Sequence, residues 1–220
     1  MRKDQLLKLL EYRYRMNSPA EIPIYHISDI VNLRNIITGE GLRSDVAMTE
    51  LMPEVIGYDH IKKRRATENR VECCGNRFVG EFVPFYYCPR SPMLYTINRG
   101  KTGRPPGCQR NILHLVSTVG IAVEAATDWA ISDGNAGAKH SLFYKDLKEL
   151  ARLDWPAIRA TQWQGQTHQK AAEFLVADFF PWNGIQKIGC HNEKIAQQVR
   201  DILDGLGHQP RVEVEPSWYY

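Results

Sequence analysis

Four short blocks of the sequence carry side chains whose types suit the chemistry of a single site. In chain order they hold His26, Arg64 with Arg65, Tyr86 with Tyr87, and Glu173. A carboxylate stabilises developing positive charge, and an arginine suits phosphate oxygens through its planar fork of donors. Tyrosine offers a flat face for a ring, and histidine donates hydrogen bonds to hydroxyls. The four types together suit a site that holds a phosphate-bearing substrate and a cationic transition state.

Each of these residues alone has a structural explanation. His26 lies in an apolar segment, where a hydrogen-bonded core histidine is common, and Glu173 begins an apolar segment, where a strand-end carboxylate is common. Paired tyrosines usually pack across strands, and a run such as Lys62–Arg65 usually forms a solvated face. The functional interpretation therefore depends on the combination.

The bulk composition limits the class of protein. The 220 residues are 43% hydrophobic, which predicts one globular domain over residues 1–220. A net charge of +3 permits a nucleic-acid partner without requiring one. No apolar run approaches the roughly 20 residues of a membrane span, and no apolar segment of a signal peptide follows Met1. We expect a cytoplasmic protein without a membrane partner.

Several enzyme classes lack their motifs here. The sequence has no G-x-G-x-x-G, G-x-x-x-x-G-K-[ST], H-E-x-x-H or G-x-S-x-G pattern. The five cysteines form no C-x-x-C pair, so we expect reduced thiols and no metal. A zinc site is the alternative, with possible ligands Cys73, Cys74, Cys88 and His114.

The elements that must position these residues follow from periodicity and breakers. Pro84 places the aromatic segment 78–87 at a sheet edge or a bend. Residues 98–110 form an exposed loop with four basic residues, and residues 160–170 form a polar loop. We expect helices over 4–16, 30–38, 144–153 and 193–206, and strands over 23–27, 78–87, 112–116, 120–125, 173–180 and 185–189. Helices and strands do not alternate regularly, which predicts an α+β fold rather than a doubly wound sheet.

The blocks, taken in order, resemble the DarT family of DNA ADP-ribosyltransferase toxins. The resemblance covers approximately residues 22–204, and its most specific part is Pro84-Phe85-Tyr86-Tyr87-Cys88-Pro89-Arg90-Ser91-Pro92-Met93. The other blocks are Ile24–Ile27, Ile56–Arg65, Asp133–Ala136, Phe143-Tyr144 and Ala172–Val176.

The resemblance implies the ADP-ribosyltransferase fold, in which two small split mixed sheets with flanking helices surround an NAD cleft. His26, Tyr86 or Tyr87, and Glu173 occupy the three signature positions of that fold. NAD is then the cosubstrate. The implied catalytic residues are Glu173, Arg64 and Arg65, and the implied cofactor contacts are Tyr25, His26, Ser28, Gly57, Arg64, Arg65, Tyr86 and Tyr87.

The chemistry of NAD fits these residue types. Cleavage of the nicotinamide–ribose bond passes through an oxocarbenium-like transition state, which a carboxylate stabilises. The leaving group is already cationic and needs no general acid. The acceptor nitrogen must lose a proton, and the same glutamate is able to accept it.

The segment before Glu173 indicates the acceptor. Relatives that modify protein arginines carry Gln or Glu two residues before the catalytic Glu, where this chain has Ala171. The loop of residues 161–170, called the acceptor loop below, offers amides and an aromatic ring, which suit an unstacked base. The expected DNA contacts are Met93, Gln162, Trp163, Gln164, His168 and Lys170, with Gln166 also facing base edges.

The resulting hypothesis is a monomeric toxin that transfers ADP-ribose from NAD to a base, thymidine by resemblance, in single-stranded DNA. A separately encoded macrodomain antitoxin would reverse the modification. Two alternatives remain open: an NAD glycohydrolase that uses water as acceptor, and a non-catalytic single-stranded nucleic-acid-binding module. Glu173 argues against the second, because a carboxylate repels phosphates.

Overall fold

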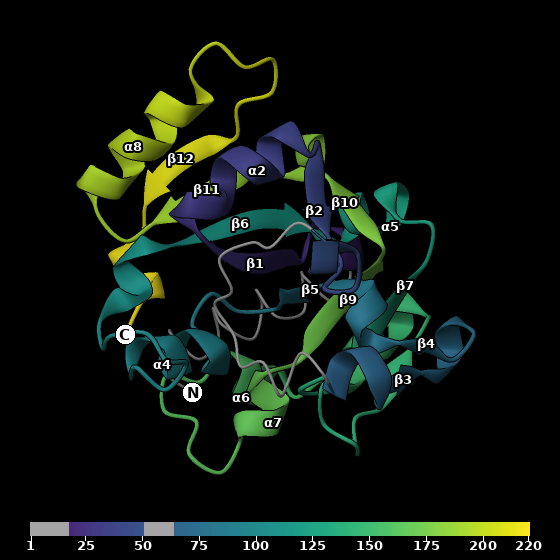
Figure 1. The fold of residues 1–220 in the computed structure, drawn as a ribbon. Coiled ribbons are helices and arrows are strands. Elements are labelled where there is room, and N and C mark those ends of the chain that lie inside the picture. Colours follow the sequence, from purple (N-terminus) through teal and green to yellow (C-terminus); the bar gives the residue numbers. More distant parts are fainter. Residues whose placement is uncertain (1–17, 51–63) are drawn as a thin grey trace.

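The computed structural model describes residues 18–50 and 64–220, which form a mixed α+β fold (Figure 1). The strands are β1 Pro23–Asp29, β2 Gly41–Arg43, β3 Arg70–Val71, β4 Arg77–Phe78, β5 Phe82–Tyr86, β6 Ile112–Thr118, β7 Trp129–Ser132, β8 Phe143–Tyr144, β9 Glu173–Ala177, β10 Phe179–Pro181, β11 Lys187–Cys190 and β12 Arg211–Val214. The α-helices are α2 Leu33–Thr38, α4 Pro92–Asn98, α5 Val119–Ala125, α6 Trp155–Arg159, α7 Thr167–Lys170 and α8 Glu193–Leu203. The 3₁₀-helices are η1 Pro19–Glu21, η2 Ile30–Asn32, η3 Ala47–Glu50, η4 Glu72–Cys74, η5 Val79–Glu81, η6 Cys108–Asn111, η7 Leu147–Arg152, η8 Trp182–Gly184 and η9 Pro216–Trp218. The helix expected over residues 4–16 and the expected NAD contact Gly57 lie outside the described residues.

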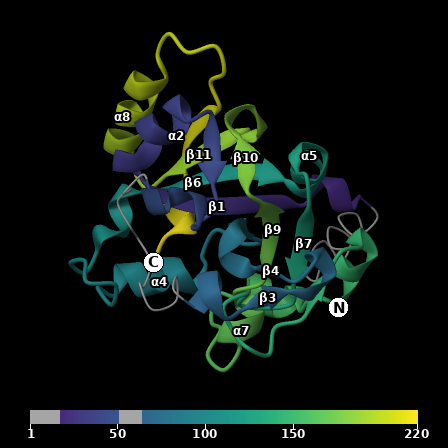
Figure 2. The ribbon, with the colours of Figure 1, turned by 45° about the vertical axis from the view of Figure 1, so that its right-hand side comes forward.

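The main sheet consists of two halves that are barely joined. Its strand order is β12-β11-β6-β1-β5-β9-β7-β8, with β11 and β12 parallel and the other pairs antiparallel. Strand β1 pairs with β6 from Pro23 to Asp29 but with β5 only through Tyr25 and Tyr86. The strands β9 and β7 run across the direction of β1 and β6 (Figure 2). This is the split arrangement that the family resemblance implied.

Pro84 marks the place where the two halves separate. Its carbonyl accepts a hydrogen bond from His26 Nδ1 at 2.9 Å, and a proline has no N–H to donate to a ladder. Strand β5 still pairs with β9, from Phe82 to Tyr86, so it is an interior strand. The expectation of an edge strand is therefore wrong, and the interruption occurs on the β1 side only.

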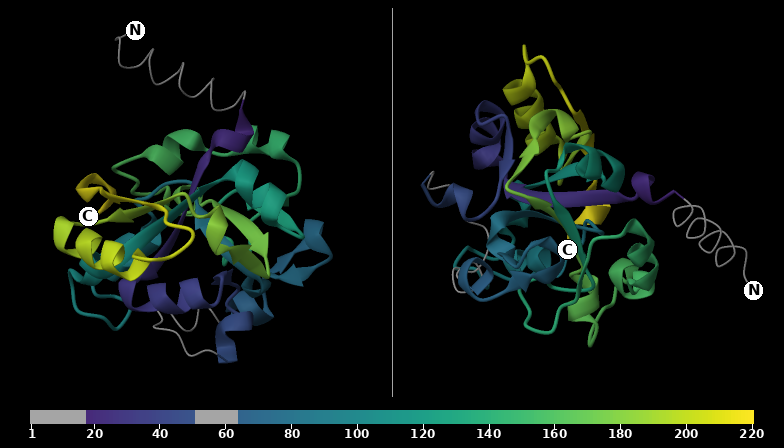
Figure 3. Two further views of the ribbon diagram at one scale, coloured as in Figure 1. Left: turned by 90° about the horizontal axis from the view of Figure 1, so that it is seen from above. Right: turned by 90° about the vertical axis from the view of Figure 1, so that its right-hand side faces the viewer.

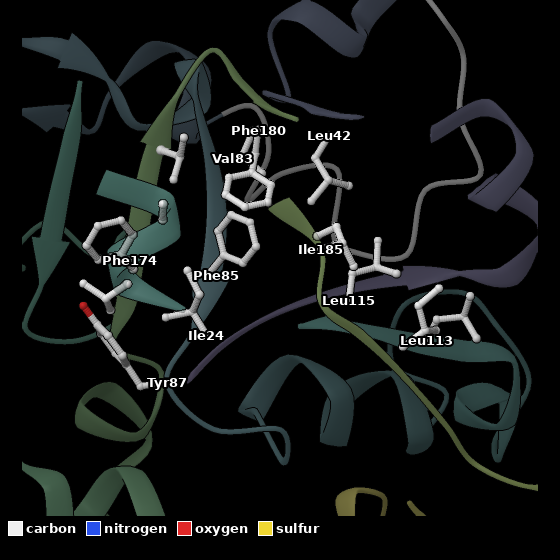
Figure 4. Close-up of a cluster of buried hydrophobic side chains, with 14 of the residues drawn as sticks. Ile24, Leu42, Val83, Phe85, Tyr87, Leu113, Leu115, Phe174, Phe180 and Ile185 are labelled. Atoms are coloured by element: carbon white, nitrogen blue, oxygen red, sulfur yellow. The ribbon is translucent and has the colours of Figure 1, made fainter. Parts of the chain in front are cut away.

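A hydrophobic core fills one face of the sheet. Ile24, Phe85, Leu115 and Phe174 belong to it, and each has at most 1% of its surface exposed (Figure 4). Helix α8 covers the β11–β12 end, whereas α6 and α7 lie at the opposite end of the molecule (Figures 1 and 3). None of the helices in the described part of the chain is long and apolar enough to span a membrane.

Three sequence-based assignments are wrong. Residues 120–125, expected as a strand, form most of α5, because Thr118 caps the helix and the buried Val119 and Ala122 are three residues apart. The helix expected over 144–153 is β8 followed by η7. The strand expected over 173–180 is broken at Asp178, whose φ of 60° separates β9 from β10.

His114 connects β6 to two distant segments inside the protein. Its ring is fully buried, with Nε2 2.9 Å from the carbonyl oxygen of Pro89 and Nδ1 3.2 Å from the Tyr219 hydroxyl. Burial lowers the pKa of His114 from 6.5 to about 4. The folded protein therefore holds this side chain neutral in a range where the unfolded chain protonates it.

We predict that His114 makes the protein less stable in mild acid. The unfolded chain binds the proton near pH 6.5 and the folded protein only near pH 4. The free energy of unfolding should thus fall as the pH drops through that window, by up to about 1.4 kcal/mol per pH unit. Urea unfolding of the wild type and of His114→Gln from pH 8 to pH 4 measures this. A stability difference between the two proteins that stays constant over that range would contradict it.

Candidate active site

The site is built around Glu173, the first residue of β9. The residue has 1% of its surface exposed, and its strand β9 lies between β5 and β7. Arg65 Nη1 donates to Oε2 at 3.0 Å and to Oε1 at 3.3 Å, and the backbone N–H of Ala136 donates to Oε1 at 3.1 Å. These donors compensate the desolvation of a buried carboxylate.

The backbone around Glu173 is fixed by Ser132 at the end of β7. The N–H of Glu173 donates to Ser132 Oγ at 3.0 Å, and Ser132 Oγ donates to the carbonyl of Gly134 at 2.7 Å. The turn of residues 133–137 thus brings the Ala136 N–H to the carboxylate. Ala136 lies in the block Asp133–Ala136 of the family resemblance, whereas Ser132 carried no signal in the sequence.

Arg65 lies in a short helical segment, residues 64–67, that packs closely on η5. Gly80 allows this contact, because a Cβ there would lie 2.9 Å from Ala66 Cα. Arg65 is 7% exposed, and its Nε and Nη2 have no partner among the described residues. Burial alone would lower the pKa of Arg65, but Glu173, Asp45 and Tyr86 together more than offset burial and raise it. The guanidinium is therefore a fixed cation with two unused donors.

Arg64, the neighbouring candidate, points elsewhere. It donates to the carbonyl of Gly137 at 3.2 Å and forms an ion pair with Glu68 at 3.6 Å, with 38% of its side chain exposed. The sequence did not distinguish the two arginines, and the structure puts Arg65 on the carboxylate.

Tyr25, Tyr86 and Glu173 follow one another across three neighbouring strands. Tyr25 is the register partner of Tyr86, and Tyr86 is the register partner of Glu173. Directly paired residues project to the same face of a sheet, so these side chains form a row. Burial raises the pKa of Tyr86, and the Glu173 carboxylate adds to the effect. Tyr86 therefore stays a neutral hydroxyl beside the carboxylate.

The other described residues expected to contact NAD are Tyr87, Ser28 and His26, and each has contacts elsewhere in the protein. Tyr87 is 5% exposed and packs in the main core against Trp155, with ring centroids 5.4 Å apart (Figure 4). Ser28 is 8% exposed and accepts a hydrogen bond from Asn32 Nδ2 at 3.4 Å. His26 bridges to Pro84 where the two halves of the sheet separate.

The acceptor loop presents part of the set expected to contact DNA. Gln162, Gln164 and Gln166 are exposed, and Trp163 is half-buried with its ring 5.4 Å from that of Tyr95. Met93 is half-buried on α4.

His168 closes the loop against the turn of residues 133–137. A Cβ on Gly134 would lie 2.2 Å from His168 Nε2, so the imidazole rests directly on the glycine. Burial, together with the neighbouring His140, lowers the pKa of His168.

Lys170 corrects one expectation. We expected it near DNA phosphates, but it is 2% exposed, and its Nζ donates to the carbonyl of Ile158 at 2.8 Å and contacts Cys88 Sγ at 3.6 Å. Its aliphatic stem and its partners hold it inside the protein, where it has no access to a phosphate.

Three of the four ligands of the alternative zinc site have other partners in the protein. Cys74 Sγ donates to the carbonyl of Trp129, Cys88 contacts Lys170, and His114 contacts Pro89 and Tyr219. No group of three potential metal ligands occurs within residues 18–50 and 64–220.

The donor set suits a dinucleotide substrate. The two unpartnered nitrogens of Arg65 are able to hold phosphate or hydroxyl oxygens, and the buried carboxylate beside them is able to stabilise positive charge on a ribose. The Tyr86 ring lies next to that carboxylate and offers an apolar face to a planar ring.

Comparisons with known proteins point the same way. A family model described as "ssDNA thymidine ADP-ribosyltransferase, DarT" matches residues 25–220. A DNA ADP-ribosyl transferase of Thermus aquaticus is 40% identical over 207 residues, which cover 92% of this chain and 90% of that protein. The structure of Thermus sp. 2.9 DarT in complex with ADP-ribosylated single-stranded DNA superposes with a TM-score of 0.83 at 36% identity, covering 92% of this chain and 97% of that one. Thermus sp. 2.9 DarT in complex with NAD⁺ gives a TM-score of 0.79 at 33% identity, covering 92% and 99%.

The adjacent arginines provide a matched test of the geometry. Arg65→Ala should lower the free energy of unfolding by about 3–5 kcal/mol, because it leaves the buried Glu173 carboxylate without its charged partner. Arg64→Ala should cost about 1 kcal/mol or less, since its ion pair is half-exposed. Urea unfolding at pH 7 measures both variants. Equal losses would show that Arg65 does not carry the buried charge.

Proposed function

The chain belongs to the DarT family of NAD-dependent DNA ADP-ribosyltransferases, and from that premise we propose that Glu173 is its catalytic carboxylate, that thymidine in single-stranded DNA is its acceptor, and that it acts as the toxin of a toxin–antitoxin pair. The observation that carries the catalytic assignment is the buried Glu173–Arg65 pair with two unpartnered guanidinium nitrogens. A macrodomain antitoxin that removes the modification is the partner we propose.

NAD supplies an ADP-ribosyl group on a cationic nicotinamide leaving group. The Glu173 carboxylate stabilises the positive charge on the ribose while the bond between its anomeric carbon and the nicotinamide nitrogen breaks. The nitrogen of the acceptor base forms the new bond to that carbon, and its proton passes to Glu173. Arg65 holds Glu173 in place and offers Nε and Nη2 to substrate oxygens.

The charge distribution supports a nucleic-acid acceptor. From Phe82 to Val123 the chain has no acidic residue, but it has five basic ones: Arg90, Arg99, Lys101, Arg104 and Arg110. Only Arg104 is paired with a carboxylate of the described residues, that of Asp29 at 2.7 Å. Helix α4, within this stretch, contacts the acceptor loop through Tyr95 and Trp163. A basic surface beside exposed amides and an aromatic ring suits a single strand.

One experiment separates the candidate functions. The protein is incubated with NAD and a labelled single-stranded oligonucleotide that contains thymidine. A covalent shift of the oligonucleotide together with nicotinamide release supports the proposal. Nicotinamide release with unmodified DNA identifies a glycohydrolase, and DNA binding without nicotinamide release identifies a binding module. An oligonucleotide without thymidine tests the base.

We predict that Glu173→Gln slows DNA modification by about 10²- to 10³-fold, because the amide keeps the shape but not the charge that stabilises the transition state. Glu193→Gln is the matched control, because its carboxylate is exposed next to Arg200 on α8 and should not affect the rate. Initial rates with saturating NAD and oligonucleotide measure both. Near-normal activity of Glu173→Gln would remove Glu173 from the mechanism.

We predict that Trp163→Ala lowers kcat/KM for the oligonucleotide by roughly 5- to 150-fold, since stacking on an aromatic ring is worth about 1–3 kcal/mol per base. The KM for NAD should remain unchanged. A duplex oligonucleotide should react more slowly than the single strand, because its base must first leave the stack. If Trp163→Ala weakens NAD and DNA use equally, or if the duplex reacts as fast, the loop does not hold an unstacked base.

A further inference from the structure

The indole of Trp163 is one end of a three-ring aromatic cluster. Tyr95 on α4 meets the Trp163 ring edge-on, with centroids 5.4 Å apart and planes at 90°. The same Tyr95 meets the ring of Tyr220 with centroids 5.1 Å apart and planes at 69°. Helix α4 therefore meets the acceptor loop at Trp163, and the segment that holds Tyr220 meets α4 at Tyr95.

Tyr220 is the most firmly held member of this cluster. Its backbone N–H donates to Gln109 Oε1 at 3.0 Å, and Gln109 Nε2 donates back to its carbonyl oxygen. Its hydroxyl donates to the carbonyl of Arg90 at 2.9 Å, and the Arg90 guanidinium lies 4.4 Å from the ring centroid. Backbone, ring and hydroxyl each have a partner, so Tyr220 is a fixed point against which the other rings pack.

Burial raises the pKa of Tyr220 to about 12, and the neighbouring Trp163 side chain acts in the opposite direction. Trp163 thus packs directly on Tyr95, and Tyr95 packs on Tyr220. At the far end of the acceptor loop, the buried Lys170 is held by the carbonyl of Ile158 at 2.8 Å. The exposed Gln164 and Gln166 lie between these two anchored points.

We propose that Tyr220 is a positioning residue for the DNA acceptor, which it serves by holding Tyr95 and Trp163 and with them the acceptor loop before Glu173. This inference rests on the proposed function, in which that loop binds the base. Loss of Tyr220 frees Trp163, so the base meets a mobile surface and its ordering costs affinity. The Glu173–Arg65 pair has no contact with Tyr220 in the described residues, so the cleavage of NAD is unaffected.

The test compares two neighbouring tyrosines in the full chain. Tyr220→Ala removes the ring, and Tyr220→Phe keeps the ring but removes the hydroxyl contacts. Tyr219→Phe is the control, because its hydroxyl donates to the carbonyl of Ile112 at 2.7 Å within the core. For each variant we measure the KM for a thymidine-containing oligonucleotide, the KM for NAD, the rate of NAD hydrolysis without DNA, and the Tm.

Tyr220→Ala should raise the KM for the oligonucleotide about tenfold, the scale of a lost aromatic contact, with the KM for NAD unchanged. Tyr220→Phe should give an intermediate value. Tyr219→Phe should lower the Tm and leave both KM values unchanged. An unchanged oligonucleotide KM in Tyr220→Ala, or a parallel rise in both KM values, would overturn the positioning role while the proposed function stands. A wild-type protein that modifies no single-stranded DNA would instead overturn the proposed function itself.

Discussion

The buried ion pair between Arg65 and Glu173 is the interaction on which the rest of the site depends. Removing both charges from water is expensive, and the pair is tolerated only because the Ala136 N–H and Arg65 Nη1 satisfy the carboxylate. That requirement explains the turn after β7 and the close approach of the Arg65 segment over Gly80. A pair of apolar residues would often be as stable or more so, and the guanidinium retains two unpartnered nitrogens. The arrangement therefore serves the binding of a ligand better than it serves the fold.

The second constraint is the opening of the sheet between β1 and β5. Pro84 has no backbone N–H to donate toward β1. Its carbonyl oxygen accepts a hydrogen bond from the His26 side chain instead of from the β1 backbone. Pairing between the two strands survives only at Tyr25 and Tyr86. That single pair sets the register in which Tyr86 lies beside Glu173, while the next residue, Tyr87, packs in the main core. A shift of one residue would exchange the two environments.

Much of this architecture was predictable from local sequence, and the failures have physical causes. The family, the α+β class, the strand around His26 and the closing helix followed from motifs, periodicity and breakers. The strand predicted over residues 120–125 was wrong because a short apolar run is compatible with a strand and with a buried helix alike. The DNA contact predicted for Lys170 was wrong because the sequence of a polar loop does not reveal which of its charged side chains is buried. The choice of Arg65 over Arg64 depends on a partner 108 residues away, and no local pattern encodes that pairing.

On the proposed function, the anchoring of the acceptor loop explains how the site favours a base over water. Once the bond to nicotinamide lengthens, the ribose reacts with whatever nucleophile is already in position, so the acceptor must be ordered beforehand. The carboxylate that stabilises the ribose cannot distinguish acceptors, because it acts on charge at the carbon. Selectivity must then come from a surface held rigidly next to Glu173. We propose that the loop supplies it, since Lys170 is held inside the protein and Trp163 packs on Tyr95, which in turn packs on Tyr220. On this proposal, rigidity outside the reacting groups determines the product.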